Sequence, residues 1–593
     1  MSRFTRCLHL ALTDRTWLLR ASRFALNLYR EQGGLGLLAK IDPLYFSAPL
    51  YRLWLNRYPI PRAPKTPSIR VALLLTNEGA PSDVLKASVN SILKQQHTNW
   101  ELWIAQPNAS LSLPELAHDL RINFIATPAT RVAQLNCLLH QARGELVLPF
   151  RAGQLLHAEL LSWLSAIFAN GNLQVARWDS DQIDALGRRN SPNYHPSWDD
   201  WLARSTPCFC APMVLRRELL LDMGGYAKDS DNACEYDLLL RLIERLQPKQ
   251  FRHLPLILSH QIGNYNAIVL NTQHQVSLDA HFVRSGILAQ TRTTLENTFQ
   301  IRLLPSIPYP AVAIVMPTRD GGKHLHTAVT SLFERTNYPL YHLYLVDNGS
   351  TDSATLGQLK RWANDSRCTV LRDPDPFNFA ALNNRAVTYT NEPLLCMLND
   401  DIEIITSHWL NDMVGALLQP GVGAAGARLW YPQGGLQHAG VIVGYGGGAG
   451  HAHKACHSGE GLAQSALLRG FSAVTAACLV THRHLFIEQG GLDAKHFPIN
   501  FNDVDYCLKL REAGQHILYV PSAELIHHES ASRGIDSTSE QRKRFACEVA
   551  SLRTRWAHWI VEDPAYNPNL TLLREDYSLA WPPRRSAWLQ VEQ

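Results

Sequence analysis

The feature that most constrains this fold is an internal repeat, in which two long segments of the 593-residue chain follow the same order of apolar and polar residues. The first begins with VALLLTNEG at 71–79 and the second with VAIVMPTRDG at 312–321. In each, a short apolar strand precedes a polar turn, an amphipathic helical pattern and another strand, which makes a βαβ unit. Such units imply a parallel sheet with right-handed crossovers. Because a repeat of about 240 residues is too long for a solenoid, we predict two copies of one α/β domain.

The repeat continues beyond these strands and sets the domain boundaries. GGYAKDSDNACEYDLLLRL at 224–242 parallels GGLDAKHFPINFNDVDYCLKL at 490–510. IRLLPSIPYP at 301–310 joins the copies, and DPAYNPNL at 563–570 is an extended, turn-rich part of the tail. We therefore predict four regions: a basic helical N-terminal region with a linker (1–67), a first α/β domain (68–300), a second α/β domain (310–535), and a C-terminal helix with an extended tail (536–593).

The N-terminal region is strongly basic, since residues 1–67 hold eleven Lys/Arg and three Asp/Glu, whereas the whole chain has a net charge of only +4. So small a total charge argues against a nucleic-acid partner. Apolar residues within 13–40 recur at helical spacing, which predicts an amphipathic helix. Two explanations stay open for this helix: packing with a solvated basic face, or docking on a membrane surface or a partner.

Several features bear on the compartment. Arg, Asp and His interrupt the N-terminal apolar residues, so no cleavable signal peptide is expected. No run reaches the ~18 apolar residues that a membrane-spanning helix requires. The eleven cysteines include no CxxC pair, which is typical of reduced thiols. We predict a soluble cytoplasmic protein, with peripheral contact at the inner membrane through the basic region as the alternative.

Acidic residues of the second copy lie where open α/β sheets bind ligands, beyond the carboxyl ends of strands. LYLVDNGSTD places Asp347 directly after a strand, LCMLNDDIEI does the same for Asp400 and Asp401, and FNDVDYCLKL places Asp503 and Asp505 at a helix start. Adjacent carboxylates are costly to bury unpaired. Mg²⁺ or Mn²⁺ removes that penalty and also carries substrate phosphates. One such cluster is explained by a turn or a cap, but three in one framework predict a metal and phosphate site.

A set of motifs in this order resembles one family. The motifs are VMPTRDGGKHL, LVDNGSTD, FNFAALNNRAV, MLNDDIEI, HAGVIVGYGGGAGHAH, SAVTAACLVTHRHLF, GGLDAKHFPINFNDVDYCLKLREAG, LIHHESASRG and the tail RWAHWIVEDPAYNPNL. Together they are similar to family-2 glycosyltransferases of the GT-A fold, in the bacterial subgroup associated with rhamnosyl transfer and surface polysaccharides. The resemblance covers residues 310–575, and 70–262 more weakly. It implies two tandem GT-A domains, each Rossmann-like with a mostly parallel sheet, with helical extensions at both ends.

The resemblance also implies roles for residues of the nucleotide site. Asp347 would hold the nucleoside base, with Thr318 and Arg319 near the nucleotide. Asn384 fits a position that lines the donor pocket. Asp400, in the NDD sequence at the family's DxD position, would face the ribose.

Three further residues would carry the metal and the chemistry. The resemblance implies that Asp401 binds Mn²⁺ or Mg²⁺ and that His527 completes the metal–diphosphate site. Asp503 aligns with the catalytic base of the family's acidic helix-start motif. Asn399 departs from the family's commonest first Asp, so a third metal-site acid is not expected.

These residue types suit glycosyl transfer on chemical grounds. Cleavage of the donor's anomeric bond puts negative charge on a nucleoside diphosphate, which a divalent metal stabilises. An acceptor hydroxyl attacks once a carboxylate takes its proton. One base and direct attack invert the anomeric carbon, whereas glycosidases flank the bond with two carboxyl groups. Together with the resemblance, this chemistry leads us to expect an inverting enzyme that moves a sugar from a nucleotide-sugar donor to a glycan or lipid-linked acceptor in bacterial surface polysaccharide synthesis.

The first copy lacks the metal-site acids. It reads VLPFRAGQLL at 147–156 where the second reads MLNDDIEI. It keeps Glu235 at the helix start, and His260 parallels the later histidine. We predict a degenerate domain that binds no donor; the alternative is a metal-independent transferase in which Arg151 supplies the positive charge.

Other readings remain open at this stage. A nucleotidyltransferase would need a Gly-rich, basic loop after its first strand, and PTRDGGKHL is a poor version of one. A non-catalytic glycan- or nucleotide-binding scaffold would keep binding without turnover. His451, His453, Cys456 and His457 in GHAHKACH offer zinc ligands at cramped spacing, whereas an acceptor-side loop uses the close backbone approach that GYGGGAG permits.

Overall fold

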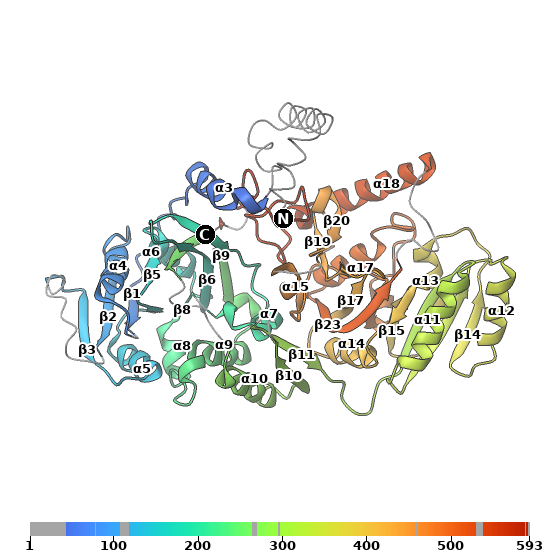
Figure 1. Ribbon diagram of the computed structural model, residues 1–593, viewed down its shortest axis with the longest axis horizontal. Helices are drawn as coiled ribbons and strands as arrows, with labels where there is room; N and C mark the ends of the chain where they lie inside the picture. The colour runs from blue at the N-terminus through green and yellow to red at the C-terminus, as the bar shows by residue number, and fades with distance from the viewer. Residues whose placement is uncertain are drawn as a thin grey trace, which may run out of the picture.

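The structure is a computed structural model of the chain. It describes residues 43–77, 79–106, 118–210, 212–263, 270–294, 297–454, 456, 460–528, 538–586 and 589–590. The amphipathic helix predicted within 13–40 lies outside the described residues. Figure 1 shows two α/β halves side by side, the first in blue to green and the second in yellow to red.

The described part of the first half is built on a nine-stranded sheet in the order β3-β2-β1-β4-β8-β6-β9-β5, with β7 beside β6. Its first four strands run parallel. The strands are β1 (Val71–Thr76), β2 (Trp100–Gln106), β3 (Ile122–Ala126), β4 (Leu146–Arg151), β5 (Gln154–Leu156), β6 (Val175–Ile183), β7 (Arg189–Asn193), β8 (Met213–Arg216) and β9 (Phe251–Ile262).

The described part of the second half is built on a ten-stranded sheet in the order β14-β13-β12-β15-β22-β17-β23-β16, with β18 beside β17 and β21 beside β23. Its first four strands also run parallel. The strands are β12 (Val312–Thr318), β13 (Tyr341–Asp347), β14 (Cys368–Arg372), β15 (Leu394–Leu398), β16 (Ile402–Ile404), β17 (Val422–Trp430), β18 (Leu436–His438), β21 (Arg469–Phe471), β22 (Cys478–His482) and β23 (His516–His527).

The two sheets repeat each other strand by strand. In both, the parallel block is followed by two antiparallel pairings, one parallel pairing (β6 with β9, β17 with β23) and a final short antiparallel strand (β5, β16). The predicted α/β fold class, with two tandem sheets that each contain a block of four parallel strands, is confirmed.

Helices cover the faces of both sheets. Those of the first half are α4 (Ser82–Leu93), α5 (Arg131–Gln141), α6 (Leu160–Phe168), α7 (Asp200–Ser205), α8 (Arg217–Asp222), α9 (Cys234–Arg245) and α10 (Thr272–Arg284), preceded by α3 (Pro43–Arg57). Those of the second half are α11 (Gly322–Arg335), α12 (Ser353–Trp362), α13 (Phe379–Val387), α14 (Trp409–Leu417), α15 (Glu460–Gln464), α16 (Arg483–Glu488), α17 (Asn502–Glu512), α18 (Ser539–Arg555) and α19 (Ala557–Val561).

The sequence explains why these elements form. β1 and β12 are buried along their whole length, as expected for central parallel strands covered on both faces. α11 buries Leu325, Ala328, Val329 and Leu332, one stripe at helical spacing. Asp352 begins α12 as its N-cap, with its side chain accepting from a backbone N–H of the first turn.

A β-hairpin connects the halves where the sequence predicts the join. β10 (Ala289–Thr293) pairs with β11 (Phe299–Leu303) in antiparallel fashion. Arg302 on this hairpin forms a 3.0 Å ion pair with the fully buried Asp412 of α14. A Cβ on Gly415 would lie only 2.1 Å from the Leu303 carbonyl oxygen, so only glycine allows α14 to pack this closely.

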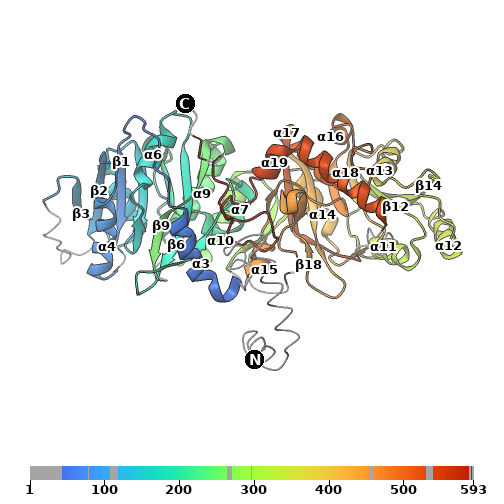
Figure 2. The ribbon, with the colours of Figure 1, turned by 90° about the horizontal axis from the view of Figure 1, so that it is seen from above.

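Residues 563–586, here called the C-terminal strap, tie the two halves together. Asp563 accepts hydrogen bonds from Ser472 Oγ (2.6 Å) and the Val443 amide (2.6 Å) of the second half. Asn567 Nδ2 then donates to Asp179 of the first half at 2.9 Å. Figures 1 and 2 show this segment crossing back over the first half.

Neither a spanning helix nor a disulfide occurs in the described residues. No described helix is both long and apolar enough to cross a bilayer. The ten described cysteines are free thiols, and of the eight between residues 208 and 507 all but Cys208 are buried or half-buried.

Candidate active site

The carboxyl ends of β12, β13 and β14 bring the first group of polar residues together. In the parallel register Thr318 lies opposite Asp347, and Asp347 lies opposite Arg372. Asp347 is almost fully buried, accepts the Ser350 amide at 2.9 Å and forms an ion pair with Arg372. Arg372 therefore fixes the carboxylate that the sequence predicts as the base-binding group, and it is a residue that the motif reading missed.

Asp400 faces the start of α11. The Thr318 hydroxyl donates to Asp400 Oδ2 at 2.6 Å. A Cβ on Gly321 would lie 2.9 Å from the same oxygen, so the turn before α11 approaches the carboxylate too closely for a side chain. Thr318, Asp347 and Asp400 thus form one connected edge.

Asp401 and His527 meet at the neighbouring edge because β16 pairs with β23 so that Ile402 lies opposite His527. Asp401 Oδ1 lies 3.2 Å from His527 Nε2. Burial opposes ionisation of Asp401, but the hydrogen bond and charge of His527 outweigh it, so the pKa of Asp401 is lowered. His528 turns the other way, with its ring beside His324 and 3.7 Å from Glu403, as expected for adjacent residues of an extended strand.

The oxygen and nitrogen atoms around Asp401 and His527 are of the kind that can ligate a divalent cation. Asn399 Oδ1 and His527 Nδ1 are buried without a hydrogen-bond partner, and Asp401 Oδ1 is beside His527. Among the described residues no three His, Cys, Asp or Glu side chains converge in a metal-binding arrangement. Mg²⁺ or Mn²⁺ commonly takes one or two protein carboxylates and completes its shell with substrate phosphate and water. The residues present therefore fit a cation that arrives with its nucleotide.

Asp503 lies in the first turn of α17 and is half-buried. Its Oδ2 accepts the Ala476 amide at 2.9 Å and its Oδ1 accepts the Val504 amide at 2.8 Å. Burial raises the pKa of Asp503 despite these hydrogen bonds. Phe501, at the N-cap, has φ +60°, a left-handed conformation that is strained for a bulky residue and that occurs often at functional sites.

The second acid of the same motif has a different environment. Asp505 is fully buried and paired with Arg555 (2.7 Å), Lys509 (3.0 Å) and Trp556 Nε1 (2.9 Å). Asp503, by contrast, accepts the backbone amides of Ala476 and Val504, and within the described part of the chain it has no charged partner as close as those on Asp505.

Hydrogen bonds between strands and loops connect Asp503 to Asn399, two residues before Asp401. β15 pairs with β22, and the Asn399 amide donates to the Ala477 carbonyl at 3.1 Å. The adjacent Ala476 amide holds Asp503. The acids from three separate segments therefore lie at one edge of the sheet; we call Thr318, Asp347, Asp400, Asp401, Asp503 and His527 the acidic edge.

Two predicted residues lie differently. Asn384 uses both ends of its amide on the backbone of Leu492, at 2.7 and 2.9 Å, and so holds the loop that leads to α17. Asn136 holds Tyr226 in the same way in the first half, at 2.9 and 2.9 Å. Arg319 is exposed beside the edge. The structure therefore shows a positioning contact for Asn384, while its place in a donor pocket stays a prediction.

The histidines of GHAHKACH have other partners. His451 Nδ1 lies 2.6 Å from His438 Nδ1, and the His453 ring stacks on Tyr577 with centroids 4.4 Å apart. His457 lies outside the described residues. The described part of this loop thus shows packing and hydrogen bonding rather than convergence of zinc ligands.

Arginines occupy the equivalent site in the first half. Arg131 and Arg151 both pair with Glu235, which begins α9 as Asp503 begins α17; the Arg151–Glu235 distance is 3.2 Å. Burial favours the neutral acid, but the two arginines outweigh it and lower the pKa of Glu235. Arg131 also donates to Thr76 at the end of β1. Where the second half has acids and unpaired atoms, the first half has a closed ion-pair network.

The predicted equivalence of His260 and His527 is wrong. In the pairing of β9 with β5, Gln261 takes the register position that His527 takes in the pairing of β23 with β16. His260 points to the other face, where its Nδ1 lies 2.6 Å from Asp181 Oδ1. One residue of shift in a strand reverses the face that a side chain occupies.

Comparisons with known proteins find similar sequences over much of the chain. Residues 313–442 match the family described as Glycosyl transferase family 2. An uncharacterized protein, y4gI of Sinorhizobium fredii, is 36% identical over 84% of this chain and 57% of its own length. The O-antigen biosynthesis protein RfbC of Myxococcus xanthus is 31% identical over 88% of this chain and 42% of its own. The chain thus spans about half the length of these relatives.

A third relative matches a smaller part of the chain. It is an N-acetylglucosaminyl-diphospho-decaprenol L-rhamnosyltransferase of Mycobacterium tuberculosis, 27% identical over 42% of this chain and 85% of its own. The matched family segment contains Thr318, Asp347, Asp400 and Asp401 of the acidic edge. The match to glycosyltransferase family 2 thus lies in the second half of the chain, at residues 313–442.

Proposed function

We propose that the second half is an inverting, metal-dependent glycosyltransferase. It moves a sugar, of hexosyl or rhamnosyl type, from a nucleoside-diphosphate donor to a glycan or lipid-linked acceptor in bacterial surface polysaccharide synthesis. The observation that carries the proposal is the acidic edge itself, which combines the Asp401–His527 pair with the half-buried Asp503, a carboxylate whose pKa is raised.

Each part of the edge has a task in this reaction. Asp347, fixed by Arg372, accepts hydrogen bonds from the nucleoside base, and Asp400, fixed by Thr318, faces the ribose. Asp401 and His527 hold Mn²⁺ or Mg²⁺. When bound, this cation supplies positive charge against the departing diphosphate.

Asp503 performs the proton transfer. Its raised pKa makes it a stronger base than an ordinary aspartate, and its two backbone hydrogen bonds fix its direction. It takes the proton from the acceptor hydroxyl as the oxygen attacks the anomeric carbon from the face opposite the nucleotide. Because this attack is direct, the configuration at that carbon is inverted.

The first half is proposed to bind no donor. Its equivalent site has no free acid at the end of β4, and Arg131 and Arg151 already pair with Glu235. This pairing also argues against the alternative in which Arg151 would neutralise a diphosphate.

We also propose that the protein works at the cytoplasmic face of the inner membrane. The support is the excess of Lys/Arg in residues 1–67 together with a lipid-linked acceptor class. Binding of the full chain to vesicles with and without anionic lipid would test this; equal binding to both would contradict it.

A screen of nucleotide sugars with Mn²⁺ or Mg²⁺ tests the activity. Wild type is compared with Asp401→Ala, Asp503→Asn and, as the matched first-half variant, Arg151→Ala. Loss of transfer in the first two and retention in the third are expected. Retention of transfer in both acid variants would refute the site, and loss of transfer in Arg151→Ala would show that the first half is the active one.

Two other outcomes would indicate a different function. Release of pyrophosphate from a nucleoside triphosphate would indicate a nucleotidyltransferase, and nucleotide binding without turnover would indicate a scaffold.

A further inference from the structure

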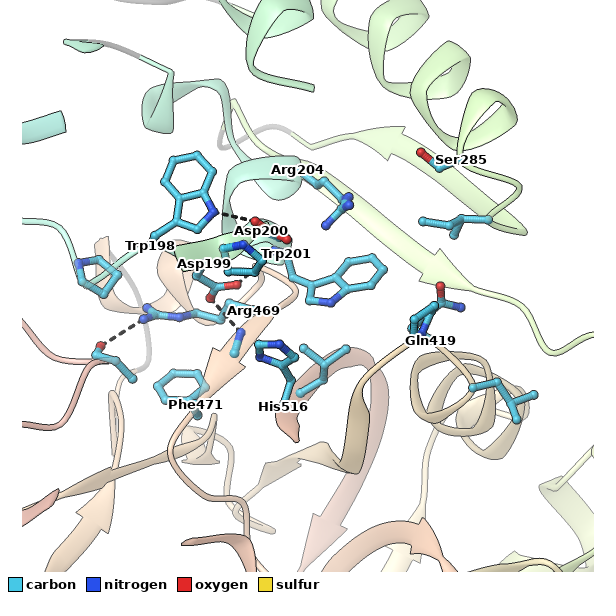
Figure 3. Close-up of a pocket in the computed structure, with 18 of the residues that line it drawn as sticks. Trp198, Asp199, Asp200, Trp201, Arg204, Ser285, Gln419, Arg469, Phe471 and His516 are labelled. Carbon is cyan, nitrogen blue, oxygen red and sulfur yellow. Dashed lines mark hydrogen bonds between the residues drawn. The ribbon is translucent and has the colours of Figure 1, made fainter. Parts of the chain in front are cut away.

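A cavity of about 700 Å³ lies between the two halves, away from the acidic edge. Its walls come from residues 196–204 and 285–288 of the first half, from 418–420, 469–471 and 511–518 of the second, and from Pro564 and Ala565 of the C-terminal strap. Figure 3 shows side chains on and before α7 facing those of β21 and β23 across this space. Its volume is within the ~300–1,000 Å³ typical of sites that enclose a small ligand.

Aromatic rings form part of this wall. Trp198, Trp201 and Phe471 line the cavity. Trp198 is rigid, because one face stacks on Phe251 at 3.9 Å and its Nε1 donates to Asp200 at 2.5 Å. Flat apolar rings with polar groups beside them suit a ligand that presents C–H faces and hydroxyls together.

The polar wall has an excess of positive charge with unused donors. Arg469 is 6% exposed, and its Nη2 donates to the Ala565 carbonyl at 3.1 Å, yet its Nε has no hydrogen-bond partner. Arg511 Nε is also buried without a partner. A buried donor without an acceptor is costly, and an anionic group in the cavity removes that cost.

The carboxylates of the wall do not cancel this charge. Asp199 accepts the backbone amides of Trp201 (3.0 Å) and Leu202 (3.2 Å) at the start of α7, and that of Gly470 (2.8 Å) across the cavity wall. Asp200 accepts Trp198 Nε1, and burial raises its pKa toward the neutral form. Among the lining residues, the three arginines Arg204, Arg469 and Arg511 therefore outnumber the two acids Asp199 and Asp200.

We propose that this cavity binds a short saccharide that carries a negative charge, through a carboxylate or phosphate. The rings of Trp198 and Trp201 contact the sugar faces, and Arg469 and Arg511 contact the anionic group. That this saccharide is part of the acceptor rests on the proposed function. Because both halves and the strap build the wall, the cavity also gives a role to a first half without metal-site acids.

Calorimetric titration of the full chain tests the proposal. The probes are a tetrasaccharide of alternating glucuronic acid and N-acetylglucosamine, and the neutral maltotetraose. Wild type is expected to bind the charged probe at least about tenfold more tightly than the neutral one. Trp201→Leu should weaken both, whereas Arg469→Gln should weaken only the charged probe.

Two further variants separate binding from folding. Ser285 is exposed at the cavity wall, so Ser285→Trp adds bulk there without removing a buried side chain, and it should weaken both probes. The matched controls are Trp103→Leu, a half-buried tryptophan of β2, and Arg428→Gln, a buried arginine of β17 whose Nε also lacks a partner. Both controls should bind as wild type. No binding of the charged probe, or equal binding across the cavity variants, would overturn the proposal.

The outcome is separable from that of the proposed function. Asp401→Ala is expected to lose transfer while binding the charged tetrasaccharide as wild type does. Transfer that survives in Asp401→Ala would contradict the acidic edge as the transfer site without affecting the cavity proposal. Normal transfer by wild type without saccharide binding would contradict the cavity proposal and not the transfer site.

Discussion

The two acids at the start of α17 have different environments, although one motif carries both. Asp503 is half-buried with two backbone hydrogen bonds, and Asp505 is fully buried with three charged or polar partners. Spacing in the sequence places both at the helix start, but only the contacts across 27 and 50 residues separate their roles.

Asp503 should set the acid limb of the pH–rate profile. Its pKa is raised, so the base becomes ionised only above the ordinary aspartate range of about 3.9, and kcat/KM should rise with pH through that raised value. Asp503→Asn should lower kcat about 10²–10⁴-fold and abolish this limb. A steady-state pH profile measures it, and an unchanged acid limb in Asp503→Asn would contradict the assignment.

The same shift predicts a gain in stability for this variant. A carboxyl whose pKa is higher in the folded than in the unfolded state favours folding at low pH, and that contribution disappears as pH rises through the folded value. At neutral pH Asp503→Asn should therefore unfold at a temperature equal to or above that of wild type. Thermal unfolding at pH 5 and 8 checks this, and it rules out misfolding as the cause of lost activity.

His527 and His528 form a natural pair of test and control. His527 faces Asp401, whereas the next residue faces Glu403. His527→Ala should weaken Mn²⁺-dependent binding of a nucleoside diphosphate by at least about tenfold, and His528→Ala should not. Titration of both variants with and without Mn²⁺ measures this; equal effects would refute the ligand assignment.

Sequence patterns located the acids but not their partners. Asp347, Asp400, Asp401 and His527 follow strands or end one, so strand periodicity places them at the sheet edge. The sequence does not indicate the role of Arg372 of β14, nor that Arg131 and Arg151 pair with Glu235, because a guanidinium that pairs across 25, 84 or 104 residues leaves no local signal.

At the scale of elements, α17 is held between the sheet and α18. Asp505 of α17 joins Arg555 and Trp556 at the end of α18. Asp505→Ala removes the carboxylate that Arg555, Lys509 and Trp556 share; because both basic side chains are partly exposed and Arg555 keeps Asp493, it should lower the free energy of unfolding by about 1–3 kcal/mol. Urea denaturation measures this, with Asp503→Asn as the matched variant; equal stability of the two would contradict the division of roles.

The elements themselves were largely predictable. The βαβ pattern after 71 and after 312 predicts the parallel strands, and both sheets have the same strand order. The short strands β5 and β16 and the register of β9 were beyond reach, because they depend on pairing across more than 100 residues. This is why His260 was assigned to the wrong face.

For the whole molecule, the C-terminal strap is the feature that the sequence concealed. DPAYNPNL predicts an extended, turn-rich segment, but nothing local shows that it crosses to the first half. Its partner, Asp179, also accepts the His195 amide (3.0 Å) and pairs with His253 Nε2 (2.8 Å). The cavity exists only in this assembled arrangement.

Removing one strap contact should loosen the assembly. Asn567 donates to Asp179 at 2.9 Å and to the His195 carbonyl at 2.7 Å, both buried. Asn567→Ala should cost about 1–3 kcal/mol and speed proteolytic cleavage between 563 and 586. Thermal unfolding measures the loss of stability and limited proteolysis measures the rate of cleavage. Wild-type values in both would show that the strap does not hold the two halves together.

The strap also has a consequence for biosynthesis. Asn567 and Asn569 leave the ribosome 388 and 390 residues after Asp179. At a translation rate of about 5–20 residues per second, roughly 20–80 s pass before these two asparagines are made. During that time Asp179 lacks two of its hydrogen-bond donors. These two contacts can therefore form only after the second half has been translated, so the first half completes its fold last.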